Sequence, residues 1–261
     1  MKAVLALALL AAAPAPDLPD VTARGTLRVL SVVRNQADDF MSEKPGRGFD
    51  REVLEGFCNL HKLKLEVIPL KGWGDLIPAL QQGRGDVIAG RFNVTAARRE
   101  QIEFTSEVFP SRHVVMTRHP HAVVATVEEL RNEKVGTVKG TSMAEVVAAA
   151  GVPPAKVDDT IVTGTLPEAL RKGTVTAVVL GIENAMSEQR KDPFIQLGTF
   201  VGPPSSLAYG VRKEDTALLA ALNEYIVNMR RTPTWNRLVV KYFGQAAPEV
   251  LRKAREGAGG N

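Results

Sequence analysis

Strand-like apolar runs alternate with helical patterns along most of the chain, and this alternation limits the possible folds more than any other feature. In the first part, strand-like runs at 26–33, 64–70 and 86–90 are separated by helical patterns at 49–63 and 73–83. The runs are rich in β-branched and other apolar residues, as expected for strands buried on both faces. This order predicts a parallel sheet covered by helices, so the expected fold class is α/β.

A second α/β unit follows a strand-like run at 111–120. Its helical patterns lie at 126–132, 141–151 and 165–173, and its strand-like runs lie at 134–140, 156–164 and 174–181. A last strand-like run at 206–215 and two helical patterns at 217–244 return to the first unit. We therefore expect two lobes with mostly parallel sheets joined by a two-strand hinge: lobe 1 from 24–116 and 207–244, and lobe 2 from 117–206. The polar tail at 245–261 is expected to fray.

The N-terminal residues differ from the rest of the chain. Lys2 precedes a run of about ten apolar residues, followed by small residues and prolines, which is typical of a secretory signal peptide. We assign residues 1–20 to this signal and expect the mature chain to start between 14 and 22. The apolar run is too short to span a membrane. The sequence thus predicts export to the periplasm or the medium.

Composition argues against several classes of function. The chain carries 33 Lys and Arg against 29 Asp and Glu, and these charges are interspersed, so no basic surface for nucleic acid is predicted. Cys58 is the single cysteine and lies in a helical pattern, where it is expected to be a small core residue. The four histidines lack zinc-ligand spacing, so we expect neither a metal nor a cofactor.

The stretch GRFNVTAARREQIEFT, from Gly90 to Thr105, indicates an anion site. Thr95 is a predicted helix N-cap, and Arg98 and Arg99 fall in the first turn after it. The N-terminus of a helix favours acids over bases, so two arginines there need an explanation. They are either solvated at a small cost, or they help to bind a carboxylate or phosphate.

Two further connections follow strands in the second unit. In VKGTSMAE, from 138 to 145, a glycine allows close approach of the backbone, and Thr141 or Ser142 caps the next helix. The stretch LGIENA, from 180 to 185, follows the last strand of the unit. Ligands of α/β sheets bind beyond the carboxyl ends of the strands, so both connections are candidate ligand loops.

These features together resemble the family 3 solute-binding proteins, the amino-acid-binding components of ABC importers. The resemblance covers about residues 25–244. It rests on GFDREV (48–53), WGDLIPALQQGRGDVIAG (73–90), NVTAARREQIEFT (93–105) and EYIVNMRRTPTWNRLVVKYFG (224–244). It implies a periplasmic-binding-protein-like fold that closes on a small ligand, and a membrane permease as partner.

The resemblance also implies roles for individual residues. Arg98 matches the arginine that holds the ligand α-carboxylate, with Asn93 beside it and Thr95 capping its helix. Trp73 matches a position where an aromatic ring packs on the ligand. Thr141 and Ser142 match a second-lobe loop that contacts the carboxylate.

The chain departs from the family pattern at several positions. The aspartate that pairs with the ligand ammonium is replaced by Gly181, and Glu183 is either its substitute or an outward surface acid. Arg91 stands where glycine is common, and either adds a second cation or closes part of the pocket. The resemblance and these departures therefore leave three kinds of ligand open: an acidic amino acid, a carboxylate without an amine, or a peptide fragment.

Three functions are compatible with these observations. The leading one is capture of an amino acid or related small carboxylate by a monomeric, non-enzymatic binding protein for ABC-type uptake. The second is a cleft enzyme on the same fold, a lyase or dehydratase with Glu183 as general acid. The third is a non-catalytic ligand-sensing module like that of membrane-bound lytic transglycosylases.

Overall fold

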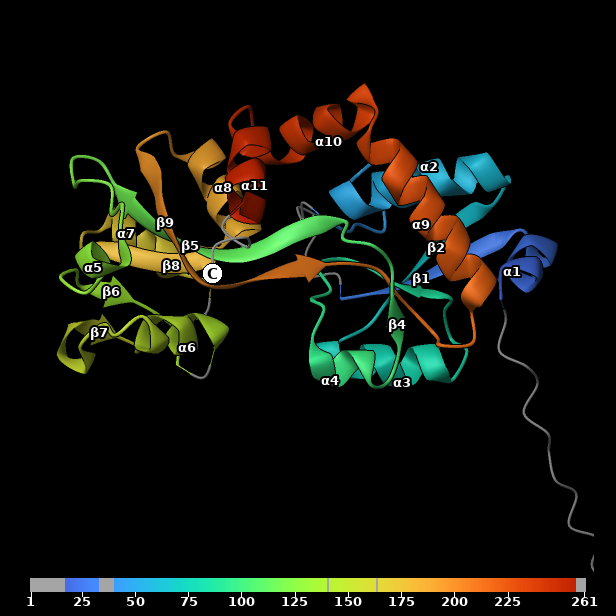
Figure 1. Cartoon of the computed structure of the whole chain (residues 1–261), viewed down its shortest axis with the longest axis horizontal. Helices are drawn as coiled ribbons and strands as arrows, with labels where there is room; N and C mark the ends of the chain where they lie inside the picture. The colour runs from blue at the N-terminus through green and yellow to red at the C-terminus, as the bar shows by residue number, and fades with distance from the viewer. Residues whose placement is uncertain (1–16, 33–39, 140, 163, 257–261) are drawn as a thin grey trace, which may run out of the picture.

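A computed structural model describes residues 17–32, 40–139, 141–162 and 164–256 (Figure 1). Most of the predicted signal peptide therefore lies outside the described residues. Residues 17–20 belong to the fold, because Asp17 caps α1 (Leu18–Arg24), with a side-chain oxygen 2.7 Å from the Leu18 amide. The same carboxylate accepts the backbone N–H groups of Ala217 and Leu218 at 3.1 and 2.8 Å. This links the start of the described chain to a helix near its end.

The first sheet has the strand order β2-β1-β3-β10-β4. Its strands are β1 (Thr26–Ser31), β2 (Lys64–Pro69), β3 (Val87–Ile88), β4 (Glu103–Phe104) and β10 (Gly210–Val211). β1 pairs in parallel with β2 and β3, whereas β10 returns antiparallel between β3 and β4. Around it lie α2 (Phe49–His61), the 3-10 turn η1 (Trp73–Asp75), α3 (Leu76–Gln81), α4 (Ala96–Arg99) and α9 (Thr216–Arg230) (Figure 1). The predicted helix at 73–83 is thus split between η1 and α3.

The second sheet has the order β7-β6-β8-β5-β9. Its strands are β5 (Phe109–Arg118), β6 (Val135–Gly136), β7 (Val157–Asp158), β8 (Ala177–Gly181) and β9 (Ile195–Leu207). Its helical elements are α5 (Val127–Leu130), α6 (Ser142–Ala149), η2 (Pro154–Lys156), α7 (Leu166–Arg171) and α8 (Ile182–Lys191). β6 is parallel to β7 and β8, and β5 is antiparallel to β8 and β9. The expected two-lobed α/β fold is confirmed.

Strands β5 and β9 connect the two lobes. They pair antiparallel from Phe109 opposite Leu207 to Arg118 opposite Ile195, and Figure 1 shows them extending from the second sheet toward the first. The sequence analysis expected a strand at 206–215, but β9 ends at Leu207 and the chain then forms the short β10. Both crossing strands are members of the second sheet, and the lobe boundaries given above stay a prediction.

An aromatic cluster surrounds the start of β5. Phe109 packs against the rings of Phe40, Phe49 and Phe243, with centroids 5.5, 5.6 and 4.9 Å away. Trp235 lies 5.3 Å from Phe49 in an edge-to-face arrangement. These rings belong to a core cluster that also contains Ile182 and Met186 of α8. The apolar core is therefore continuous across the junction of the lobes.

The expected fraying of the C-terminal tail is wrong for residues 247–256. After α10 (Pro233–Phe243) the chain forms α11 (Ala247–Glu256). Ala247, Leu251 and Ala254 recur at helical spacing, are almost fully buried, and form a narrow apolar stripe. α11 packs on β5 and β9 and lies beside α8 in Figure 1. The C-terminal segment is thus part of the folded structure around the crossing strands.

Candidate functional site

The connection after β3 has an unusual backbone, and a buried carboxylate fixes it. Gly90 and Arg91 both have positive φ angles, 92° and 61°. Asp50, in the first turn of α2, accepts the N–H of Gly90 at 3.0 Å and that of Arg91 at 3.3 Å through Oδ2. Its Oδ1 accepts the hydroxyl of buried Tyr209 at 3.2 Å. The family-like GFDREV segment therefore supplies a clamp for this connection, a role that the sequence analysis did not predict.

Thr95 caps the short helix α4, as predicted. Its hydroxyl accepts the backbone N–H of Arg98 at 3.3 Å. The Arg98 guanidinium donates to the carbonyl oxygen of Asn93 at 2.6 Å and lies 4.1 Å from the centroid of the Phe92 ring. Burial lowers the pKa of Arg98, which at neutral pH remains charged. Because α4 has only one turn, the guanidinium rather than the helix dipole supplies positive charge here.

Two other residues of the first lobe were predicted to belong to the site. Asn93 is exposed and forms an isolated bridge with Leu207 at the end of β9. Trp73 opens η1 and packs, half-buried, on the core cluster that contains Phe92. Arg99, the next residue along α4, is exposed, and its guanidinium carbon lies 5.5 Å from the centroid of the Phe104 ring.

In the second lobe, Thr141 and not Ser142 is the cap of α6. The Thr141 hydroxyl accepts the N–H of Ala144 at 3.4 Å and donates to the carbonyl oxygen of Val138 at 2.6 Å. Ser142 is exposed, and its Oγ lies 3.2 Å from Nε2 of His113 on β5. Burial lowers the pKa of His113, which favours the neutral imidazole. His113 was not predicted, because its position depends on the pairing of β5 with β8.

Glu183 folds back over Gly181 at the junction of β8 and α8. A Cβ atom on residue 181 would lie 2.6 Å from Oε1 of Glu183 and 2.8 Å from Oε2. The carboxylate therefore occupies the space that a side chain at 181 would need. Gly181 also pairs directly with His113 across β5 and β8. Glu183 is half-buried, so it is not an outward surface acid.

Two consecutive hydrogen bonds between side chains link Glu183 to the first lobe. Asn184 donates from Nδ2 to Oε1 of Glu183 at 3.2 Å. Its Oδ1 accepts Nη1 of Arg91 at 3.3 Å. The structure thus places six of the eight predicted residues in three small groups: Asn93, Thr95 and Arg98 in one, Ser142 with the unpredicted His113 in another, and Arg91 with Glu183 through Asn184 in the third.

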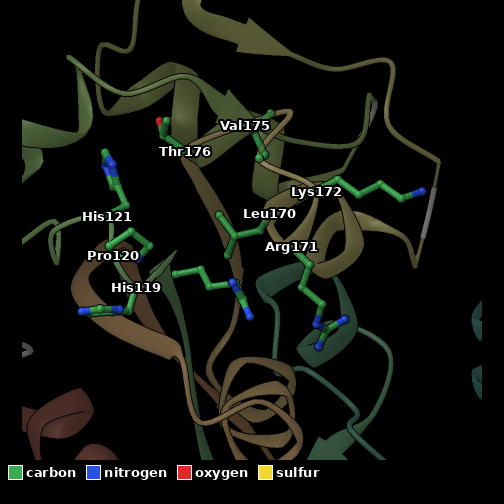
Figure 2. A pocket seen from close by; sticks show the side chains of 10 residues that line it. His119, Pro120, His121, Leu170, Arg171, Lys172, Val175 and Thr176 are labelled. Carbon is green, nitrogen blue, oxygen red and sulfur yellow. The ribbon is translucent and has the colours of Figure 1, made fainter.

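A separate cavity of about 530 Å³ lies in the second lobe beyond the last residue of β5. Figure 2 shows His119, Pro120 and His121 on one side of it and Leu170, Arg171 and Lys172 on the other. Arg118 and Arg171, which line it, donate to Asp192 at 3.0 and 3.3 Å. The Arg118 hydrogen bond lowers the pKa of Asp192. The cations here are paired with acids, and none of the eight predicted site residues lines this cavity.

Two properties of the described chain bear on the class of site. None of its helices is long and apolar enough to cross a membrane. Within the same residues, no group of three or more His, Cys, Asp or Glu side chains is placed to hold a metal ion.

Two α/β lobes joined by a pair of crossing strands, with polar groups where the strands of each lobe end, define a periplasmic-binding-protein-like molecule. Residues 30–245 match the family model of the bacterial extracellular solute-binding proteins, family 3. The chain belongs to this family, which confirms the resemblance found in its sequence.

The relatives include amino-acid-binding proteins and membrane-bound lytic murein transglycosylases. The chain is 26% identical over 208 residues to the histidine-binding periplasmic protein of Escherichia coli strain K12, covering 75% of this chain and 78% of the relative. It is 24% identical over 222 residues to membrane-bound lytic murein transglycosylase F of Desulfosudis oleivorans, covering 83% of this chain but 48% of that protein.

Solved structures show the same fold. An ancestral cationic amino acid solute-binding protein superposes with a TM-score of 0.75 at 22% identity, covering 86% of this chain and 98% of that one. The L-cystine solute receptor of Neisseria gonorrhoeae, in its unliganded open conformation, gives a TM-score of 0.74 at 16% identity, covering 88% and 97%.

Proposed function

We propose that the chain captures an amino acid or related small carboxylate between its lobes and delivers it to the permease of an ABC importer. The observation that carries the proposal is Arg98. Its guanidinium carbon lies 4.1 Å from the centroid of the Phe92 ring, and the group donates to the Asn93 carbonyl oxygen, so it is partly desolvated and fixed in position. A fixed guanidinium binds a carboxylate through two parallel hydrogen bonds.

The other groups complete this proposed site. Asn93 and Thr95 lie beside the arginine, and Trp73 offers an aromatic surface for the ligand body. At the start of α6, Ser142 supplies a hydroxyl group from the second lobe, and Thr141 holds the turn through its bonds to Val138 and Ala144. Contacts from both lobes would be completed only when the lobes close, so ligand binding favours closure.

Glu183 is the proposed partner of the ligand ammonium. Its carboxylate already fills the space above Gly181, where the family pattern places an aspartate. A longer acid two residues later, combined with glycine at 181, puts a carboxylate in nearly the same place. Asn184 orients it by donating to Oε1. This geometry supports an amino acid over a carboxylate that lacks an amine.

Export and a monomeric state complete the proposal. The part that Asp17 plays in capping α1 and binding α9 supports cleavage of a signal peptide before Asp17. N-terminal sequencing of the extracytoplasmic protein tests this, and a mature chain that retains Met1 would contradict it. Purified protein should elute as a monomer in size-exclusion chromatography with light scattering.

The second candidate, a sensing module, is favoured only by the similarity to the lytic transglycosylase. The chain spans about half the length of that relative, so a shared ligand-binding module without the catalytic part is the corresponding proposal. Mass spectrometry of candidate ligands after incubation distinguishes a binder, which returns them unchanged, from a cleft enzyme, which converts them.

A thermal-shift screen over amino acids and small carboxylates, followed by calorimetry, tests the main proposal. Arg98→Ala should lower the affinity for the ligand found by about 30-fold to several thousand-fold, equivalent to roughly 2–5 kcal/mol. Arg98→Lys should fail almost as badly, because an ammonium cannot form the two parallel bonds. Arg99→Ala is the matched control and should bind like the parent. Equal binding by Arg98→Ala and the parent would refute the proposal.

A further inference from the structure

We infer that Glu107 is the centre of a polar latch at the hinge, which limits the range of lobe orientations without contacting the ligand. The latch consists of Glu107, Ser206, Arg230 and Arg255. By restraining the hinge it also raises ligand affinity, and this second part rests on the proposed function. Three observations carry the inference: an interrupted ladder between the crossing strands, the contacts of Glu107, and a link from Ser206 to the Arg98 segment.

The ladder between β5 and β9 is interrupted where the chain passes from one lobe to the other. Ser111 pairs with Ser205 and His113 pairs with Val201, so β9 advances by four residues while β5 advances by two. The extra residues of β9 include Gly202, at φ 72°, and two prolines, which lack the N–H group that a ladder bond needs. Lobe movement therefore pivots at this break.

Glu107 connects four elements on the first-lobe side of the break. Its Oε2 accepts the hydroxyl of Ser206 on β9 at 3.0 Å, and its Oε1 accepts Nε of Arg255 on α11 at 2.8 Å. Arg230, at the end of α9, donates from Nη1 to the Glu107 carbonyl oxygen at 2.9 Å, and its Nη2 lies 3.7 Å from Oε1. Burial lowers the pKa of Arg230, as does the neighbouring Arg255, whereas Glu107 raises it. One carboxylate thus holds two guanidinium groups beside the start of β5.

Polar contacts rather than close apolar packing hold the crossing strands at this point. A cavity of about 290 Å³ lies between them and α11, lined by Glu107, Pro110, 204–206, Ala254 and Arg255. Closely packed side chains restrain one another, and side chains beside a cavity lack part of that restraint. Ion pairs contribute more when several charges form a partly buried network than when they stand alone on the surface. The latch therefore supplies the restraint that packing does not.

The latch is also connected to the segment that carries Arg98. The carbonyl oxygen of Ser206 accepts the backbone N–H of Val94 at 2.9 Å. The carbonyl oxygen of Asn93 accepts the Arg98 guanidinium at 2.6 Å. Glu107 is therefore a positioning residue, which holds the end of β9 against the segment from which Arg98 projects. A looser hinge leaves more orientations to be ordered when the lobes close, and this weakens binding.

Spin labels, one in each lobe, test the latch in the ligand-free protein. Gln82→Cys in the first lobe and Glu128→Cys in the second provide exposed attachment points, and Cys58→Ala removes the single native thiol. Double electron–electron resonance then measures the distribution of distances between the labels. Glu107→Gln keeps the size of the side chain but removes its charge, and should broaden this distribution. The matched control is Glu249→Gln, which removes an ion-paired charge from the exposed face of α11 and should leave the distribution unchanged.

Calorimetry extends the test to affinity. The probe is whichever of L-glutamate, L-glutamine and L-arginine the parent binds most tightly. Glu107→Gln should bind it about two- to thirtyfold more weakly, the range for residues that couple sites without touching ligand. Ser206→Ala removes only one bond of the latch, so it should broaden the distance distribution and weaken binding to a smaller extent. Arg98→Ala should weaken binding without broadening the distribution, because it removes a ligand contact and leaves the hinge intact.

The possible results separate the latch from the proposed function. The latch is wrong if Glu107→Gln and Ser206→Ala both keep the distance distribution of the parent, or if Glu249→Gln broadens it to the same extent. A broadened distribution with unchanged affinity for the probe would contradict the effect on binding. The label measurement needs no ligand, so it decides the latch by itself. Failure of the proposed function has a different sign, which is binding that does not depend on Arg98.

Discussion

Replacing Asp50 should destabilise the protein more than replacing any exposed acid, because its carboxylate holds three parts of the first lobe together. It accepts the N–H groups of Gly90 at 3.0 Å and Arg91 at 3.3 Å and the hydroxyl of Tyr209 at 3.2 Å. A hydrogen bond to a charged group contributes about 1.5–3 kcal/mol. The three bonds together would therefore contribute roughly 4–9 kcal/mol to the free energy of unfolding if nothing replaced them.

The loss of stability in Asp50→Ala should be smaller than this sum, because water and a relaxed connection can accept some of the hydrogen bonds that the carboxylate accepts in the parent. We expect a loss of about 3–5 kcal/mol in the free energy of unfolding, a large fraction of the 5–15 kcal/mol typical of native proteins. Asp50→Asn keeps one acceptor for the backbone amides and can donate its NH₂ to the Tyr209 oxygen. Its loss should be about 1–3 kcal/mol.

Urea unfolding followed by circular dichroism measures both values, with an unchanged m-value as evidence that the same surface is exposed. Glu214→Gln, an exposed acid changed to its amide, is the control and should stay within about 0.5 kcal/mol of the parent. A loss below about 1 kcal/mol for Asp50→Ala would refute the clamp, as would equal losses for the alanine and asparagine variants.

Two further predictions concern the C-terminal helix and His113. Leu251→Ala should destabilise the protein by about 2–5 kcal/mol by leaving a cavity under α11, whereas Lys253→Ala on the exposed face should change little; equal effects in urea unfolding would contradict the packing described for α11. The lowered pKa of His113 means that the unfolded chain binds its proton more readily, so the stability from this group is complete above pH 6.5 and is lost as the pH falls below that value. His113→Gln should therefore flatten the pH dependence of stability between pH 7 and 5, while His119→Gln, at an exposed position, should leave it as in the parent.

The order of strands and helices was predictable because hydrophobic periodicity is a local signal. The predicted strand at 26–33 and helix at 49–63 correspond to β1 and α2 within two residues. β9 was missed because Gly198, Gly202 and the prolines at 203 and 204 are typical of a loop, and only pairing with β5 makes this segment a strand. α11 was missed because two of the three residues in its apolar stripe are alanines among charged residues.

The candidate site was predictable only in part, for a related reason. Thr95 and Arg98 interact over three residues, so the cap and its neighbouring arginine could be found in the sequence. His113 meets Ser142 only because β5 pairs with β8, and Asn184 meets Arg91 only because the two lobes touch. Contacts of this kind depend on tertiary structure, which periodicity does not report. Whether these residues bind ligand stays a prediction.

The position of α11 has a consequence for any attempt to exchange parts between relatives. The chain passes between the lobes in β5 and in β9, and it then continues from α9 through α10 to α11, which packs on both of those strands. On α11, Arg255 donates to Glu107 just before β5 at 2.8 Å. A chimera that transplants the second lobe as residues 109–207 alone would set foreign strands against the host's α11. The exchangeable unit is therefore discontinuous, and residues 247–256 belong with it.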